Sequence, residues 1–461
     1  MKWPQSVFPP RAANAGLTRR AIAVFGALTI AVLLGAGVLF VWKPWEPNYH
    51  PHYESPFGVY ITFDSDPSRQ ATVHYQTLPQ DGTVTLDSEG KACCYFGVSS
   101  HEGSPESYPL HATGETYTIA GLRDGRRVHR VVLEQLEPGC TYYFVVGDGS
   151  TGYSPERKFK TLPGGDSPLR FVVGGDMGGY PPEDYPNTLP LLREAAKRDP
   201  QFAVVGGDIA YAGANLRRVE RWDKWFEAWS EVMVTSDGCA IPVVAAIGNH
   251  DANDESMETP AKRAPFYVAF FRSEPPYSYF TLQLADYARL FVLDSGYLAP
   301  ASGTQSTWLA EELRAASDVP VKMAVYHVPM YPAYRDFDGD HSTWERESWL
   351  PLFDQYGMTV AFENHDHVFK RSFRLRDNRI DPSGTLYLGD GCFGVKPRPI
   401  PGDDRWYLEK RASQGHFWLV DIDREDGIEF QAVTPDGSIF DRCSLSLPKV
   451  QPVETSEELP R

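Results

Sequence analysis

Five short motifs between residues 174 and 367 place side chains that can bind metal ions directly after apolar stretches. Carboxylate, phenol, amide and imidazole groups supply the oxygen and nitrogen donors that iron, zinc and manganese sites use. A first carboxylate, a second one able to bridge, and three histidines would suffice for two metal ions. The candidate side chains are Asp176, Asp208, Tyr211, Asn249, His327, His365 and His367.

A single motif of this kind would carry little weight. An aspartate at the end of a strand is usually a turn or helix-cap residue, and a buried histidine is usually only hydrogen-bonded. The five motifs are GGDMG, GGDIAYA, GNHD, VYHVP and NHDH, in that order. Each follows an apolar run, and the glycines before Asp176 and Asp208 allow tight turns. Their repeated placement therefore favours one shared site for two metal ions.

The apolar runs before the motifs predict buried β-strands. Helical patterns, such as TLPLLREAAKR and STWLAEELRAAS, separate these runs. Buried strands that alternate with helices indicate an α/β layered domain, which we expect over residues 168–447. Open α/β sheets bind ligands at the carboxyl ends of their strands, which is where the motifs lie. The runs are LRFVVGGD, QFAVVGGD, IPVVAAIGNHD, RLFVLDS, VKMAVYHVP and TVAFENHDH.

Residues 56–163 show a different pattern of short strands and turns. The segments are rich in β-branched and aromatic residues, and Asp-Pro, Asp-Gly and Pro-Gly turns separate them. This spacing predicts an all-β sandwich of immunoglobulin-like size. The stretch LEPGCTYYFVVGD resembles the late strands of fibronectin type III domains. The predicted strands are GVYITF, ATVHYQT, YTIAGL, HRVVLEQL and TYYFVVGD.

Residues 21–42 contain no charged side chain and predict one transmembrane helix. A helix of that length spans about 30 Å, the thickness of the bilayer core. The positive-inside rule places residues 1–20 in the cytoplasm and the rest of the chain outside, because basic residues precede the helix: Lys2, Arg11, Arg19 and Arg20. A cleaved signal peptide, which would release a secreted protein, is the alternative. Its apolar core is normally shorter, so we favour a membrane anchor.

The composition indicates a folded chain of two domains with an acidic surface. The 461 residues carry a net charge of -17, with 13% aromatic and 23% charged residues. We predict no nucleic-acid partner, because no basic stripe is visible. The six cysteines lack metal-site spacing, and an outside location would permit disulfides of undetermined pairing. The polar tail, residues 448–461, is expected to be loose.

The ordered motifs resemble those of the purple acid phosphatase family within the calcineurin-like metallophosphoesterases. GDxG, GDxxY, GNH(D/E), VxxH and HxH follow in the family's order, and the upstream β domain resembles that of plant and some bacterial members. The likeness covers residues 56–447. It implies a ferric ion on Asp176, Asp208, Tyr211 and His367. It also implies a divalent iron, zinc or manganese ion on Asp208, Asn249, His327 and His365, with Asp208 as the bridge.

Tyr211 distinguishes this pattern from that of ordinary two-metal phosphoesterases, which usually begin with D-x-H. Gly178 stands at that histidine position, and a phenolate is a hard, anionic ligand that suits ferric iron; the alternative is a core aromatic residue. Asn364 replaces a usual glycine, and the segment 369–371 reads Phe-Lys-Arg where Tyr-Glu-Arg is common. We interpret Asp251, found where Glu is frequent, as a support for the site or a turn residue.

The resemblance implies a metal-dependent acid phosphatase that hydrolyses small phosphate monoesters. Ferric iron would lower the pKa of bound water, and the resulting hydroxide would attack phosphorus. His250 directly follows Asn249, and the family assigns this histidine to the leaving group, so we predict that His250 is the general acid. His341, in a predicted loop, is a second candidate for that task. Asp294 and Asp390 also follow strands, and we expect structural roles for both.

Two other functions stay open. A phosphodiesterase or nucleotide pyrophosphatase of the same superfamily would use the same metal pair. A non-catalytic surface-binding protein could use the fibronectin-like domain instead. The intact set of metal ligands argues against this last function, because an inactive site would be free to lose them. The sequence leaves the second metal and the oligomeric state open.

Overall fold

The computed structural model describes residues 56–78, 92–253, 259–271, 275, 278–389 and 391–447. The predicted cytoplasmic segment, the predicted membrane helix at 21–42, the polar tail and Asp390 lie outside these described residues. Within the described ranges, no helix combines the length and apolarity needed to cross a bilayer.

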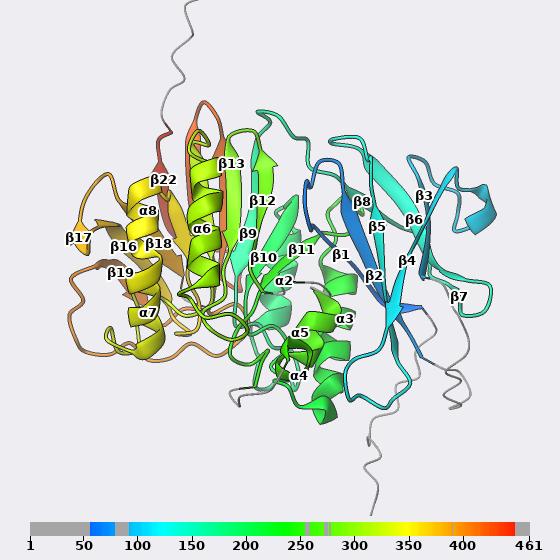
Figure 1. The fold of residues 1–461 in the computed structure, drawn as a ribbon, viewed down its shortest axis with the longest axis horizontal. Helices are drawn as coiled ribbons and strands as arrows, with labels where there is room; N and C mark the ends of the chain where they lie inside the picture. Colours follow the sequence, from blue (N-terminus) through cyan, green and yellow to red (C-terminus); the bar gives the residue numbers. More distant parts are fainter. Residues whose placement is uncertain are drawn as a thin grey trace, which may run out of the picture. The chain divides into compact units, whose positions relative to one another are not determined.

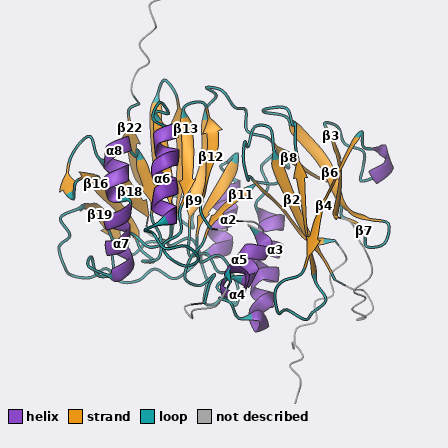
Figure 2. Cartoon of the chain, viewed as in Figure 1, coloured by secondary structure: helices purple, strands orange, loops and turns teal. Residues whose placement is uncertain are grey.

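The N-terminal domain is an antiparallel β-sandwich (Figures 1 and 2). Strands β1, β2, β5 and β4 pair in that order on one side, and β4, β3, β6 and β8 pair on the other, with β7 beside β6. The predicted sandwich is thereby confirmed. The strands are β1 (Phe57–Thr62), β2 (Ala71–Thr77), β3 (Ala92–Gly97), β4 (Leu110–Tyr117), β5 (Arg127–Leu133), β6 (Thr141–Asp148), β7 (Gly152–Tyr153) and β8 (Arg157–Lys160).

One predicted strand of this domain is wrong. The stretch YTIAGL, residues 117–122, is a turn after its first residue, and the strand lies upstream as β4. Most side chains of β4 are exposed, so this strand lacks the apolar pattern that the prediction relied on. Ile119, which attracted the strand assignment, is instead buried in a hydrophobic cluster with the helix that carries Trp222 and Phe226.

The C-terminal domain contains two β-sheets that face each other across an apolar core. The first has the order β22-β21-β20-β9-β10-β11, and β1 of the sandwich pairs with its edge strand β11. Its strands are β9 (Leu169–Gly174), β10 (Phe202–Gly206), β11 (Val243–Ala246), β20 (Phe417–Asp423), β21 (Gly427–Val433) and β22 (Ile439–Leu445).

The second sheet has the order β12-β13-β14-β15-β18-β16-β17, with β19 on β16. Residues such as Val204 and Val244 of the first sheet pack with Val325 and Phe362 of the second. The strands are β12 (Phe280–Ala285), β13 (Ala288–Val292), β14 (Val321–Val325), β15 (Val360–Phe362), β16 (Phe369–Arg376), β17 (Arg379–Ile380), β18 (Thr385–Gly389) and β19 (Leu408–Ala412).

Helices cover the outer face of each sheet (Figure 2). The first sheet carries α2 (Thr188–Ala196), α3 (Val219–Val232), α4 (Pro260–Arg263) and α5 (Pro265–Phe270). The second carries α6 (Thr304–Ala315), α7 (Asp340–Ser348) and α8 (Leu350–Tyr356). The predicted α/β layered domain is thereby confirmed.

The five motifs follow parallel strands of both sheets. β9, β10 and β11 are parallel neighbours, as are β13, β14 and β15. Parallel strands end at the same edge of a sheet, so the loops after β9, β10 and β11 meet the loops after β14 and β15. This edge is where the candidate side chains come together.

Candidate metal centre

Five of the seven candidate ligands have a left-handed backbone conformation. The φ angles of Asp176, Asp208, Tyr211, His365 and His367 lie between 53° and 77°. Such a conformation costs a non-glycine residue of order 1–3 kcal/mol, and it persists only where the surrounding structure enforces it. Here the peptide N–H of Asp176 donates to Gly207 at 3.0 Å, for example. Strain concentrated on these residues points to a functional requirement at the strand ends.

The first group of donors consists of Asp176, Tyr211 and His367. The Tyr211 hydroxyl lies 3.2 Å from Asp176 Oδ1 and 3.2 Å from His367 Nε2. His367 Nε2 and Asp176 Oδ1 are 2.9 Å apart. A carboxylate oxygen of Asp208 also lies within 4.8 Å of the Asp176 and His367 donors. All four side chains that the resemblance gives to the ferric ion therefore come together.

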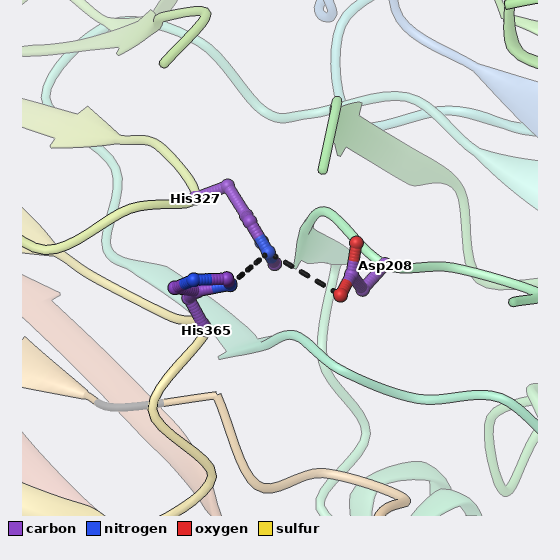
Figure 3. A group of neighbouring side chains, drawn as sticks. All are labelled: Asp208, His327 and His365. Carbon is purple, nitrogen blue, oxygen red and sulfur yellow. Dashed lines mark hydrogen bonds and ion pairs between the residues drawn. The ribbon is translucent and has the colours of Figure 1, made fainter. Parts of the chain in front are cut away.

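The second group consists of Asp208, His327 and His365, which Figure 3 shows, together with Asn249. His327 Nε2 lies 3.3 Å from Asp208 Oδ2, 3.1 Å from Asn249 Oδ1 and 3.1 Å from His365 Nδ1. The other ring nitrogen, Nδ1, donates to the carbonyl oxygen of Gly206 at 2.9 Å. This hydrogen bond leaves the lone pair of Nε2 for a metal ion, the usual arrangement for a ligand histidine.

The donor set fits a pair of metal ions. Asp208 belongs to both groups, and its buried Oδ2 atom faces His327 Nε2 at 3.3 Å without a regular hydrogen bond. Such an oxygen costs about 1–3 kcal/mol unless a positive group satisfies it. Gly391 allows a close approach to the same site, because a Cβ atom there would lie 1.8 Å from Asp176 Oδ2. A bound cation beside Asp208 would satisfy this buried carboxylate.

The electrostatic surroundings of His327 favour a cation. Burial lowers the pKa of this histidine, but Asp208 and Asp176 outweigh burial and raise the pKa to about 10. The pKa of Asp208 stays below its ordinary value, because His327 outweighs the effect of burial. The negative potential that would hold a proton on His327 would equally hold a metal ion.

Asp251 fixes the two loops that carry Asp208 and Asn249. Its carboxylate accepts hydrogen bonds from the peptide N–H groups of Asp208 at 2.8 Å, Ile209 at 3.0 Å and Gly248 at 2.9 Å. Burial and the charge of Asp208 raise the pKa of Asp251 to about 7. In this structure Asp251 supports the site rather than only forming a turn.

The two histidines predicted to act in catalysis lie at different distances from the donors. The His250 side chain is 50% exposed, its Nε2 lies 4.0 Å from Asp208 Oδ2, and its ring stacks on Tyr211 at 4.5 Å between centroids. His341 lies in the first turn of α7, so the predicted loop is wrong. Its ring stacks on Tyr297 at 5.7 Å, and Tyr297 in turn meets the ring of His327 at 6.0 Å.

Two family descriptions match this chain. "Purple acid Phosphatase, N-terminal domain" matches residues 56–161, and "Calcineurin-like phosphoesterase" matches residues 169–369. The chain belongs to the purple acid phosphatase family. This finding agrees with the resemblance drawn from the motifs.

Plant proteins are among those similar to this chain. Purple acid phosphatase 15 of Arabidopsis thaliana is 26% identical over 331 residues, which are 64% of this chain and 60% of that relative's length. Phosphoenolpyruvate phosphatase of Allium cepa is 27% identical over 368 residues, 73% of this chain and 72% of the relative. The solved structure of purple acid phosphatase PPD1 from yellow lupin seeds has a TM-score of 0.71 at 16% identity, covering 85% of this chain and 74% of that one. At this identity the lupin structure supports the fold alone.

The departures from the purple acid phosphatase motifs have structural explanations. Asn364 donates to the Tyr326 carbonyl at 2.8 Å, and a Cβ atom on Gly206 would lie 1.9 Å from its amide. Lys370 is fully buried and pairs with the buried carboxylate of Glu363. In this chain the positive charge of Lys370 is therefore balanced by Glu363, which lies in the segment VAFENHDH.

Sequence analysis missed several residues that support the site. Glu363 accepts hydrogen bonds from the Tyr326 hydroxyl and the Met330 peptide N–H, both at 2.7 Å. Arg221 donates to the Tyr211 carbonyl at 2.8 Å and to the Tyr185 hydroxyl at 3.2 Å. Glu363 could have been found from the sequence, because an acidic residue directly after an apolar run is unusual. Nothing in the sequence around Arg221 indicated its contact with the site.

The remaining candidates have structural roles or none. Asp294 is fully buried and accepts hydrogen bonds from four consecutive peptide N–H groups, those of residues 296–299, and from the Ser278 hydroxyl. None of the six cysteines, all of which lie within the described ranges, forms a disulfide bond in this structure.

Proposed function

We propose that this protein is a metal-dependent acid phosphatase that hydrolyses small phosphate monoesters. The observation that carries the proposal is the position of Asp208, whose buried carboxylate belongs to both donor groups. Tyr211 in the first group supports a ferric ion there, with divalent iron, zinc or manganese in the second position. Relatives named purple acid phosphatase and phosphoenolpyruvate phosphatase support the substrate class.

The protein's own residues would orient the reacting groups. Two bound ions supply positive charge for the phosphate and lower the pKa of water. Asp251 holds the loops of Asp208 and Asn249 in place through its three peptide hydrogen bonds. His250 is half exposed at the rim, with its ring fixed against Tyr211, so it can donate a proton to the leaving oxygen.

His341 would assist in a more remote position. Its Nδ1 donates to the Ser295 carbonyl at 2.5 Å, which leaves Nε2 for a substrate contact. Because Tyr297 separates its ring from His327, we expect a smaller contribution from His341 than from His250.

Hydrolysis assays with metal analysis test this function. The purified protein should contain two metal ions per chain, one of them iron, and should hydrolyse phenyl phosphate faster than a diester such as bis-nitrophenyl phosphate in mildly acidic buffer. Faster diester hydrolysis would favour the phosphodiesterase alternative. Two bound metals without hydrolysis of either substrate would favour the surface-binding alternative.

We also propose that residues 21–42 anchor the protein with its catalytic domain outside the cytoplasmic membrane. The uncharged segment and the basic residues before it support this orientation. Protease added to intact cells or spheroplasts should digest the catalytic domain, and protection until lysis would contradict the orientation. Release of a soluble form would indicate signal-peptide cleavage instead.

A further inference from the structure

The segment of residues 332–335, which follows ligand His327, is held unusually firmly. Its four consecutive carbonyl oxygens all accept hydrogen bonds from two arginines. Arg405 donates to residues 332, 334 and 335 at 2.5, 3.0 and 2.7 Å, and Arg411 donates to residue 333 at 3.2 Å. Asp403 pairs with both arginines, at 2.8 and 3.3 Å. This scaffold fixes the position of Arg335 at the end of the segment.

Arg335 is attached directly to the loop that carries two metal ligands. Asp366, between His365 and His367, is fully buried and accepts hydrogen bonds from the peptide N–H groups of Tyr334 at 2.7 Å and Arg335 at 3.2 Å. Its other oxygen lies 3.4 Å from Arg335 Nε. The guanidinium group therefore lies at the edge of the metal centre.

A second arginine, Arg398, is hydrogen-bonded to the loop that carries His365 and His367. The peptide N–H of Arg398 donates to the His367 carbonyl at 2.9 Å, and its guanidinium carbon lies 5.1 Å from the centroid of the Tyr334 ring. Among the described residues, Arg398 forms no ion pair with a carboxylate. The side chain of Arg335 is 42% exposed, and its terminal nitrogens form no hydrogen bond within the described ranges. Two arginines thus present donors to solvent beside the metal ligands of a protein with a net charge of -17.

Neutralisation of Asp366 accounts for Nε of Arg335, which faces Oδ1, a buried oxygen with no hydrogen-bond partner in the described part of the chain, at 3.4 Å. It does not account for the terminal nitrogens of Arg335 or for Arg398, which forms no ion pair with a carboxylate among the described residues. We propose that Arg335 and Arg398 bind a second anionic group, a carboxylate or phosphate on the leaving group of the substrate. Guanidinium groups suit this task because their parallel N–H donors match the oxygens of such anions. The inference rests on the proposed phosphatase function and specifies its substrate class.

Matched substrates test the inference: carboxyphenyl phosphate, its methyl ester and phenyl phosphate. The wild type should have a lower KM for the carboxylate than for the ester. In Arg335→Ala this preference should fall about tenfold, mainly through KM, because one charge-assisted interaction is lost. Arg335→Lys should keep part of the preference. Arg442→Ala is the control, since Arg442 is also exposed and pairs with a single carboxylate, Glu429, at 3.0 Å; its preference should not change.

Arg398→Ala provides an independent variant, because the Arg398 side chain makes no contact with Asp366. It should also lower the preference while each chain keeps its metals. Equal losses for all three substrates in both variants would mean that the arginines only support the site, and the inference would be wrong. An unchanged preference in both variants would also overturn it, although the phosphatase function would stand. A wild type that hydrolyses none of the three substrates would overturn both proposals.

Discussion

His74 and His129 in the β-sandwich are about as buried as His327 in the metal centre, at 1%, 2% and 0% exposure. In the sandwich, burial lowers their pKa values to about 3 and about 4. A threonine hydroxyl faces Nε2 of His74, threonine hydroxyls face both ring nitrogens of His129, and the two rings stack on Tyr60 and Tyr75, respectively. In the metal centre, two aspartates outweigh burial and raise the pKa of His327 to about 10.

The contrast shows how surroundings, rather than residue type, distinguish a structural histidine from a candidate ligand. The neutral imidazole of His129, which lies between two hydroxyl groups, is satisfied by hydrogen bonds alone. The imidazole beside Asp208 lies in a negative potential that a cation would relieve. Each of the following predictions changes one side of this contrast.

The largest effect should follow from Asp208→Asn. This change removes the charge shared by both donor groups, so the variant should lose both metal ions and nearly all hydrolytic activity. The loss of metal affinity should exceed the 10–100-fold typical of residues outside the ligand set. Elemental analysis after dialysis would measure it. Retention of two metals per chain would contradict the bridging assignment.

A smaller loss should follow from His250→Ala, which leaves every donor atom in place. Turnover should fall roughly 10²–10⁴-fold, the usual contribution of general acid catalysis, while the metal content stays constant. The loss should be smaller for nitrophenyl phosphate than for phenyl phosphate, because a good leaving group needs no proton. Equal losses for the two substrates would rule out the acid role.

The phenol group of Tyr211 should determine colour more than stability. A phenolate bound to ferric iron absorbs visible light by charge transfer, so the iron-loaded wild type should be pink to purple. Tyr211→Phe should bleach the protein while most remaining ligands keep a metal ion, and its ring can still stack on His250. A colourless, active wild type that contains iron would show that Tyr211 is not a ligand.

The smallest expected effect is on the pH dependence of folding stability, through a histidine of the β-sandwich. Burial lowers the pKa of His129 from 6.5 to about 4. Between these two pH values, the imidazole is therefore protonated in the unfolded chain and neutral in the folded chain. Folding stability should therefore fall as the pH drops through this window, by about 2 kcal/mol per such histidine at about pH 5. His129→Gln should reduce the loss between about pH 7.5 and pH 5 in denaturant titrations. An unchanged pH dependence would mean that His129 is protonated in the folded protein.

The sequence predicted those elements whose burial gives a clear apolar pattern. The buried strands before each motif were expected where they lie, because their apolar runs are continuous. The exposed strand β4 was missed for the opposite reason, and His341 was placed in a loop although it begins a helix. Apolar periodicity does not report on exposed elements.

The candidate site was predictable only in part. The types and order of Asp176, Asp208 and His367 could be read along the chain, whereas the sharing of Asp208 between two metals came from a family resemblance. Arg335 and Arg221 could not be found in advance, because their contacts join segments that are distant in sequence. Such supporting contacts depend on tertiary packing.

Anomalous diffraction from crystals of the purified protein tests the central claim most directly. Data collected at the iron edge, and at the edge of the second metal that elemental analysis identifies, would locate each ion separately. The account predicts two peaks, with iron among Asp176, Tyr211 and His367, the second metal among Asn249, His327 and His365, and Asp208 between them. A single peak, or iron without Tyr211 in its coordination shell, would contradict it.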